Sequence, residues 1–218
     1  MAIRVLLVDD DPLVRSALKT IVEADEDLQI VGEASDGDEA ASAARSHSPE
    51  VVLMDLLMER QNGIEATAAV RSLPDAPHVI ALTTWGPEEA VVQMIEAGAS
   101  GFLLKTASPR EIRGAIRAVV DGDAVLSPRS TRQLLDRWRS MAPTPQENRA
   151  VATLSQLTVR ERDIALAAAQ GLTNDEIGAN LFLSPATVKT HLSAIQAKLG
   201  VKNRVMVAVL VERAGWLR

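Results

Sequence analysis

Short apolar runs alternate with longer amphipathic stretches through the first half of the chain. The runs are continuous and rich in Val, Ile and Leu, as in strands that are buried on both faces of a sheet. The predicted strands are Ile3–Val8, Gln29–Val31, Val51–Met54, Val79–Leu82 and Gly101–Leu104. The amphipathic stretches predict helices at Pro12–Ala24, Asp38–Ser46, Gly63–Arg71, Pro87–Ala97 and Pro109–Val120.

This alternation predicts an α/β fold, because each strand is followed by a helix that crosses back over the sheet. The result is a doubly wound, five-stranded parallel sheet with helices on both faces. In such sheets a binding site lies beyond the carboxyl ends of the strands.

The second half of the chain is predicted to be helical. Thr158 with Glu161, and Thr173 with Glu176, form two capping boxes that open helices. A third helix follows the Ser184-Pro185 pair, and a fourth spans Asn203–Ala214. We therefore expect a first domain over residues 1–124, a linker helix and flexible linker over 125–152, and an all-α four-helix domain over 153–218.

Charge is distributed unevenly between the two halves. The whole chain carries −6, but residues 1–126 have 10 Lys and Arg against 22 Asp and Glu, whereas residues 127–218 have 13 against 7. A basic half joined to an acidic half suggests that the basic half binds a polyanion such as nucleic acid. The unevenness also fits ordinary solvated charge.

The chain has no cysteine, which excludes disulfides and thiolate metal sites and fits a reducing cytosol. We find no secretory signal and no apolar run near the roughly 18 residues of a membrane span. These features predict a cytoplasmic protein that has no membrane contact.

Polar side chains follow four of the predicted strands. Asp9, Asp10 and Asp11 follow the first, Asp55 the third, Thr83 the fourth and Lys105 the fifth. Carboxylates that meet at one sheet edge repel one another, and Mg²⁺ relieves this through oxygen ligands. A carboxylate there could act as a nucleophile toward phosphorus.

The segments "VLLVDDDPLVR", "VVLMDLLMERQNGIEA", "VIALTTWG" and "GASGFLLK" resemble the motifs of receiver domains, over about residues 3–121. The resemblance implies a flavodoxin-like sheet of order 2-1-3-4-5. It further implies the following site roles: Asp55 as phosphoacceptor, Asp10 and Asp55 as Mg²⁺ ligands, Asp9 as a ligand partly through water, the Leu57 backbone carbonyl as a further ligand, Thr83 as switch hydroxyl, Lys105 as phosphate-binding lysine and Phe102 as aromatic switch.

The sequence departs from the receiver pattern at three positions. Glu59 and Thr106 stand where proline is frequent, and Thr84 stands where a smaller residue is frequent. Glu59 adds a negative charge near the site, and Thr106 leaves the isomer of the Lys105–Thr106 peptide bond open.

The segments "LT.RE", "G.TN.EI" and "S..TVK.H" resemble the helix-turn-helix module of LuxR-type regulators, over about Leu157–Leu217. In the third helix of this region, Val188, Leu192, Ile195 and Leu199 form the predicted buried stripe. Lys189, Thr190 and Ser193 lie on other faces and suit the major groove. The predicted phosphate contacts are Thr187, His191, Lys198 and Lys202.

The segment "RVMVAVLVER" is apolar nearly all round, so its helix must be covered on more than one side. The LuxR-type resemblance implies dimerisation through this helix, with Ala208 and Val211 as candidate contacts. A helix that is simply buried in the core is the alternative.

Together the two resemblances, to the NarL/FixJ family of two-component response regulators, imply a transcriptional regulator. A sensor histidine kinase would phosphorylate Asp55, and a homodimer would bind double-stranded promoter DNA. We expect no enzyme activity beyond self-catalysed phosphoryl acceptance and slow autodephosphorylation. A receiver that only mediates assembly is the alternative. An aspartyl phosphatase would need a second Asp at position 57, and a nucleotide-binding enzyme would need a Gly-rich loop in place of "DDDP".

Overall fold

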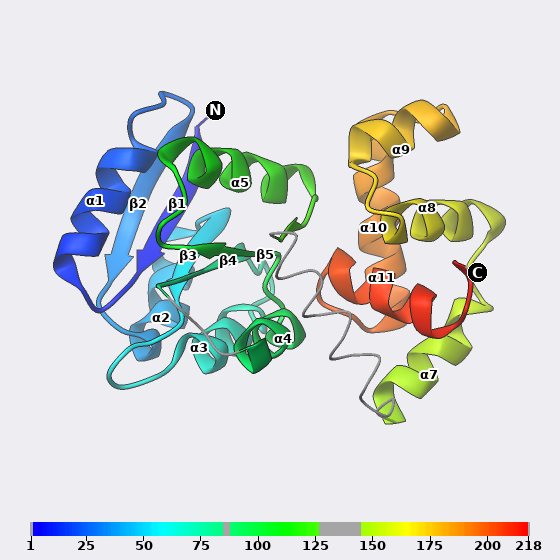
Figure 1. The fold of residues 1–218 in the computed structure, drawn as a ribbon, viewed down its shortest axis with the longest axis horizontal. Helices are drawn as coiled ribbons and strands as arrows, with labels where there is room; N and C mark the ends of the chain where they lie inside the picture. Colours follow the sequence, from blue (N-terminus) through cyan, green and yellow to red (C-terminus); the bar gives the residue numbers. More distant parts are fainter. Residues whose placement is uncertain (1, 85–87, 127–144, 218) are drawn as a thin grey trace.

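The computed structural model describes residues 2–84, 88–126 and 145–217, which form an α/β domain followed by a helical domain (Figure 1). The strands are β1 (Ile3–Val8), β2 (Leu28–Ala34), β3 (Val51–Asp55), β4 (His78–Thr83), β5 (Gly101–Leu104) and β6 (Val125–Leu126). They pair in parallel in the order β2-β1-β3-β4-β5-β6. The predicted doubly wound sheet is confirmed.

Two helical layers cover the sheet. The helices are α1 (Pro12–Val22), α2 (Gly37–His47), α3 (Gly63–Val70), α4 (Glu88–Ala97) and α5 (Pro109–Asp121). Helices α1 and α5 pack on one face over Val5, Leu53 and Ile80. Helices α2, α3 and α4 pack on the other face over Leu6 and Met54 (Figure 1). Alternate residues of one strand therefore enter different cores, which explains the continuous apolar runs.

The sheet has one strand more than the five that the sequence predicts. The sixth, β6, is two residues long and pairs Gly101 with Val125 and Phe102 with Leu126. Two residues are too few to produce a periodic pattern, so sequence periodicity could not detect this edge strand.

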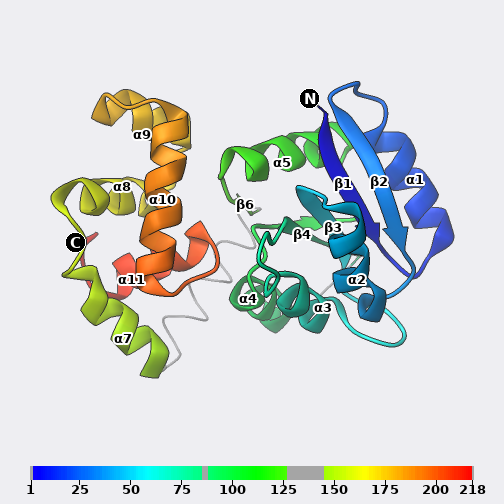
Figure 2. The ribbon, with the colours of Figure 1, turned by 180° about the vertical axis from the view of Figure 1, so that it is seen from behind.

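The helical domain contains α7 (Pro145–Leu154), α8 (Val159–Ala169), α9 (Asn174–Leu181), α10 (Pro185–Leu199) and α11 (Arg204–Arg213), as Figure 2 shows from behind. Both capping boxes are present, at Thr158 and Thr173, and Ser184 caps α10. Residues 145–152 fall in the predicted linker, but they belong to α7, whose Ala150 and Leu154 are buried in this domain. The rest of the predicted linker helix, residues 127–144, lies outside the described residues.

Helix α11 is apolar nearly all round because it packs on both domains. Val207, Leu210 and Val211 are buried in the core of the helical domain. Val205 and Val209 are instead buried in the α/β core, together with Ala99 and Phe102.

This packing corrects the candidate dimer contacts. The Val211 side chain is 0 % exposed, so another copy could not reach it without unfolding the domain. Ala208 is half-buried and lines a cavity between the two domains. The alternative of a thoroughly buried helix describes Val211 in this structure.

Gly63 allows close packing beneath the β3–α3 loop, because a Cβ at this position would lie 2.0 Å from the Asp55 carbonyl oxygen. We predict that Gly63→Ala destabilises the chain and displaces Asp55. Gly114→Ala, on exposed α5 with no atom within 4 Å of its new Cβ, should instead stabilise by about 0.5–1 kcal/mol. Urea unfolding of both variants measures this, and an equal effect of the two would refute the packing argument.

Candidate functional site

The carboxyl ends of β1, β3 and β5 bring three predicted site residues together. Lys105 Nζ lies 2.6 Å from Asp9 Oδ2 and 3.1 Å from Asp55 Oδ1. Asp9 and Asp55 are buried, and Asp10 is half-buried. Thr83, at the end of β4, is also buried. The predicted convergence of Asp9, Asp10, Asp55, Thr83 and Lys105 at one sheet edge is therefore what the fold places there.

The surroundings of the buried carboxylates disfavour their negative charge. Burial raises the pKa of Asp55 above its ordinary value, the charge of Asp9 raises it further, and Lys105 only partly opposes this. Burial alone would lower the pKa of Lys105, but Asp9 and Asp55 raise it above the usual range. One lysine thus compensates two buried carboxylates incompletely.

The donor set suits a hard divalent cation. Asp9, Asp10 and Asp55 each offer an oxygen, and the three atoms lie within 4.8 Å of one another. Asp9 Oδ2 is buried, and the partner that the described chain gives it is the Lys105 ammonium at 2.6 Å. A buried carboxylate oxygen with unused acceptor capacity, beside two more carboxylates, fits Mg²⁺.

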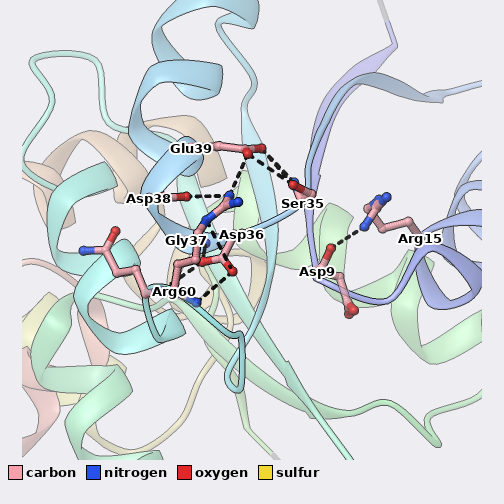
Figure 3. Close-up of polar contacts among 9 residues, drawn as sticks. Asp9, Arg15, Ser35, Asp36, Gly37, Asp38, Glu39 and Arg60 are labelled. Carbon is pink, nitrogen blue, oxygen red and sulfur yellow. Dashed lines mark hydrogen bonds and ion pairs between the residues drawn. The ribbon is translucent and has the colours of Figure 1, made fainter.

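Asp11 does not join this group. Its side chain accepts a hydrogen bond from the Leu13 amide at 2.8 Å and caps α1. Asp9 Oδ1 accepts from the Asp11 amide at 3.0 Å, and Asp9 accepts at its carbonyl from Arg15 at 2.6 Å (Figure 3). The cap therefore fixes the backbone of the acidic turn.

A network that sequence reasoning missed holds the β3–α3 loop (Figure 3). Buried Asp36 accepts hydrogen bonds from the amides of Gly37, Arg60 and Gln61. Burial acts to raise the pKa of Asp36, but these three amides lower it overall. The Arg60 guanidinium also contacts Asp38 at 2.8 Å and Glu39 at 2.7 Å. The loop that follows Asp55 is thus tied to the start of α2.

The remaining predicted residues of this domain have different surroundings. Leu57 is 62 % exposed, and its role as a carbonyl ligand stays a prediction. Glu59 and Thr84 are exposed. Phe102 is only 4 % exposed and packs in the core, so it has no inward turn left to make from this state. The described residues contain no cis peptide bond, so Lys105–Thr106 is trans.

The predicted DNA-binding side chains lie on or beside α10. Val188, Leu192, Ile195 and Leu199 form the buried stripe, as predicted. Lys189, Thr190 and Ser193 are exposed, whereas Thr187 and His191 are half-buried. The two hydroxyls of Thr190 and Ser193 donate to carbonyls one turn earlier in α10.

Lys198 is engaged within its own domain. Its ammonium lies 2.6 Å and 2.8 Å from the two carboxylate oxygens of Glu161, which is buried at the start of α8. Lys198 also lowers the pKa of Glu161. A DNA phosphate would have to compete with this ion pair, which weakens the prediction for Lys198.

The end of α5 occupies part of the predicted DNA-binding face. Lys189 Nζ donates to the Val120 carbonyl at 2.5 Å. The Asn174 backbone amide, at the start of α9, donates to the Asp123 carboxylate at 3.2 Å. Arg204 pairs with the same carboxylate. Carbonyls at a helix C-terminus carry partial negative charge, so α5 presents to these donors the charge that a DNA phosphate would present. We call this the closed arrangement.

Two family models match the chain. Residues 5–117 match the response regulator receiver domain, and residues 155–211 match the luxR family of bacterial regulatory proteins. An acidic pocket at the ends of parallel strands, joined to a helix-turn-helix domain, defines the class of response regulators. The chain belongs to this family, in its NarL/FixJ branch with a LuxR-type helix-turn-helix domain.

Named relatives and solved structures agree with this family assignment. The transcriptional regulatory protein LiaR of Bacillus subtilis (strain 168) is 43 % identical over 214 residues, which cover 97 % of each chain. The response regulator ChrA, of a heme-sensing two-component system, is 35 % identical with a TM-score of 0.53, covering 100 % of this chain and 99 % of that one. A LuxR-family response regulator from Aurantimonas sp. SI85-9A1 is 32 % identical, with a TM-score of 0.59 over 63 % of this chain and 98 % of that one.

None of the helices in the described part of the chain is both long and apolar enough to span a bilayer.

The acidic site predicts a stability response to Mg²⁺. At 100 times its Kd, a cation that binds only the folded chain stabilises it by about 2.7 kcal/mol. We expect Asp55→Asn to reduce this gain, because one of three carboxylate ligands is lost. Without Mg²⁺ the same variant should be more stable than the wild type near neutral pH, because burial disfavours the Asp55 charge. Urea unfolding with and without Mg²⁺ checks both signs, and identical Mg²⁺ responses would contradict the site.

Proposed function

We propose that this chain is a transcriptional regulator controlled by phosphorylation, with Asp55 as the phosphoacceptor and double-stranded promoter DNA as the target. The observation that carries the proposal is the contact of Lys105 with both Asp9 and Asp55 at the strand ends, within one chain that also has a LuxR-type domain. A sensor histidine kinase is the proposed phosphodonor, and the cytoplasm is the proposed compartment.

The residues support an in-line transfer of the phosphoryl group. An Asp55 carboxylate oxygen attacks phosphorus, a new O–P bond forms, and the bond to the donor's histidine nitrogen breaks with its electron pair left on that nitrogen. Asp9, Asp10 and Asp55 would hold Mg²⁺, which would supply positive charge to neutralise the transferred oxygens. Lys105 is already within ion-pair distance of Asp55, so its ammonium can bind the oxygens of the phosphoryl group. The Thr83 hydroxyl can move beside the same oxygens.

Phosphoryl transfer is proposed to act on DNA binding through the closed arrangement. A dianionic group on Asp55 draws Lys105 away from Asp9 and disturbs the ends of β4 and β5. Those strands lead into α4 and α5, against which α11 and α10 pack. Release of α10 frees Lys189 for the major groove.

Opening also frees one side of α11. Val205 and Val209 leave the receiver core, and Ala208 is adjacent to them. Exposure of such an apolar surface to water is unfavourable. We propose that a second copy buries it, giving a dimer on a roughly two-fold DNA site. Val211 stays in the core of its own domain in this scheme.

A receiver that only mediates assembly is the second candidate, and exposed Glu59 in the loop after Asp55 is the feature that favours it. A negative charge there would repel a phosphodonor. No catalytic activity beyond self-catalysed phosphoryl acceptance and slow autodephosphorylation is proposed for either candidate.

The phosphoacceptor is tested by incubation with a small phosphodonor and Mg²⁺, followed by intact mass measurement. We expect one phosphoryl adduct, lost in Asp55→Asn and without Mg²⁺. Asp75→Asn, on the exposed surface, is the matched control and should retain the adduct. No adduct under conditions that modify another receiver would favour the assembly-only candidate.

The closed arrangement is tested by loosening the contact of α5 with the helical domain. Asp123→Asn removes the charge that pairs with Arg204 and accepts from the Asn174 amide. We expect the unphosphorylated variant to bind promoter DNA several-fold more tightly than the wild type, in proportion to the lost closure energy. Fluorescence anisotropy at fixed salt measures this, with Asp75→Asn as control. An unchanged affinity would show that closure does not limit DNA binding.

A further inference from the structure

A cavity of about 100 Å³ lies between the two domains. Among the polar residues that line it are Arg71, His78, Ser100, Lys189, Lys202 and Arg204. The first three belong to the receiver and the last three to the helical domain, so the cavity exists only in the closed arrangement. The roles assigned above to the acidic pocket do not involve any of these receiver side chains.

Positive charge accumulates around this cavity. Among the described residues that line it, Asp123 is the one carboxylate, and it pairs with Arg204. The ammonium of Lys189 donates to the Val120 carbonyl, and that of Lys202 to the Ala97 carbonyl at 3.3 Å. Carbonyls accept hydrogen bonds but do not neutralise a charge.

Arg71 adds a third cation that has no carboxylate partner in the described chain. Its guanidinium donates to the carbonyls of Ala76, Pro77 and Lys202, the last at 2.8 Å. Its Nε is buried without a hydrogen-bond partner. Closure therefore brings like charges from both domains together, which is unfavourable unless an anion lies between them.

His78 is the titratable group in this surrounding. Its Nδ1 lies 3.2 Å from the Ser100 hydroxyl. Burial, followed by the positive charges of Arg71 and Lys189, lowers the pKa of His78 to about 4. Lys202 and Arg204 of the helical domain, and Asp123 after α5, are the other charged groups around the same cavity.

We propose that this cavity binds a small multivalent oxyanion, of the class of inorganic phosphate, and that the bound anion bridges the two domains in the closed arrangement. The volume is several times the roughly 30 Å³ of one water in the liquid, which is room for a tetrahedral oxyanion. Guanidinium and ammonium groups are the donors that recognise such anions.

The bound anion lowers the affinity of the chain for DNA. Because both domains line the site, the anion binds the closed arrangement and shifts the population toward it. Lys189 cannot contact the anion and a base edge at the same time. Oxyanion and promoter DNA therefore compete, and each lowers the affinity for the other by the same factor.

The test uses the full-length chain in Mg²⁺-free buffer, with ring NMR signals of His78 followed between about pH 3.5 and pH 7.5 while inorganic phosphate is added. His78→Gln assigns the signal. We expect a saturable shift and a rise in the pKa of His78 by at least one unit, because the anion offsets the charges of Arg71 and Lys189. A rise of one unit means that phosphate binds about tenfold more tightly when His78 is protonated than when it is neutral.

Variants and a second salt distinguish specific phosphate binding in the cavity from ionic screening. Lys202→Gln should weaken phosphate binding about tenfold, whereas Lys19→Gln, on exposed α1, should leave it unchanged. Chloride at equal ionic strength should not reproduce the shift. An equal response to chloride would mean screening alone, and a shift of His191 on α10 without one of His78 would mean binding to the open DNA-facing surface. Either result, or the same affinity in Lys202→Gln, would overturn the proposal.

Discussion

The parallel sheet forces carboxylates together at one edge, and most of the molecule's behaviour depends on that constraint. Asp9 and Asp55 stand at the ends of neighbouring strands because β1 and β3 are paired in register, with Val8 opposite Met54. Neither carboxylate can leave without breaking the sheet. Lys105, delivered by β5, compensates part of their charge. Incomplete neutralisation favours uptake of a cation, and in the proposed function a phosphoryl group follows it.

The same sheet connects this site to the helical domain. Strand β4 ends at buried Thr83 and begins at His78, which faces the cavity between the domains. Helix α11 inserts Val205 and Val209 beside Phe102 of β5. The Asn203 side chain donates to the carbonyls of Ile95 at 2.8 Å and Ala99 at 2.9 Å, which ties the start of α11 to the end of α4. In the proposed function, these contacts through β4, α4 and β5 connect the strand ends to the elements that hold α10.

The sequence was sufficient for features that local chemistry determines. The strands, the capping boxes at Thr158 and Thr173, and the buried stripe of α10 follow from periodicity and from side chains that satisfy the helix ends. Asp36 and Arg60 were missed because their partnership spans 24 residues and neither has a distinctive pattern. The apolar surface of α11 indicated that the helix packs against two partners. The local sequence does not show that the second partner is the receiver domain. Long-range packing also explains why Val211 is core and why Lys198 pairs with Glu161.

The central claim is that modification of Asp55 separates α10 from α5. Because the chain has no cysteine, two spin labels can be introduced cleanly, at exposed Gly114→Cys on α5 and Ala197→Cys on α10. Pulsed electron paramagnetic resonance then gives the distance between them before and after phosphorylation, with Asp55→Asn as control. We predict one narrow distance in the unmodified chain and a longer, broader distribution after phosphorylation, absent in the control. An unchanged distance in a sample whose mass shows the phosphoryl adduct would contradict the account.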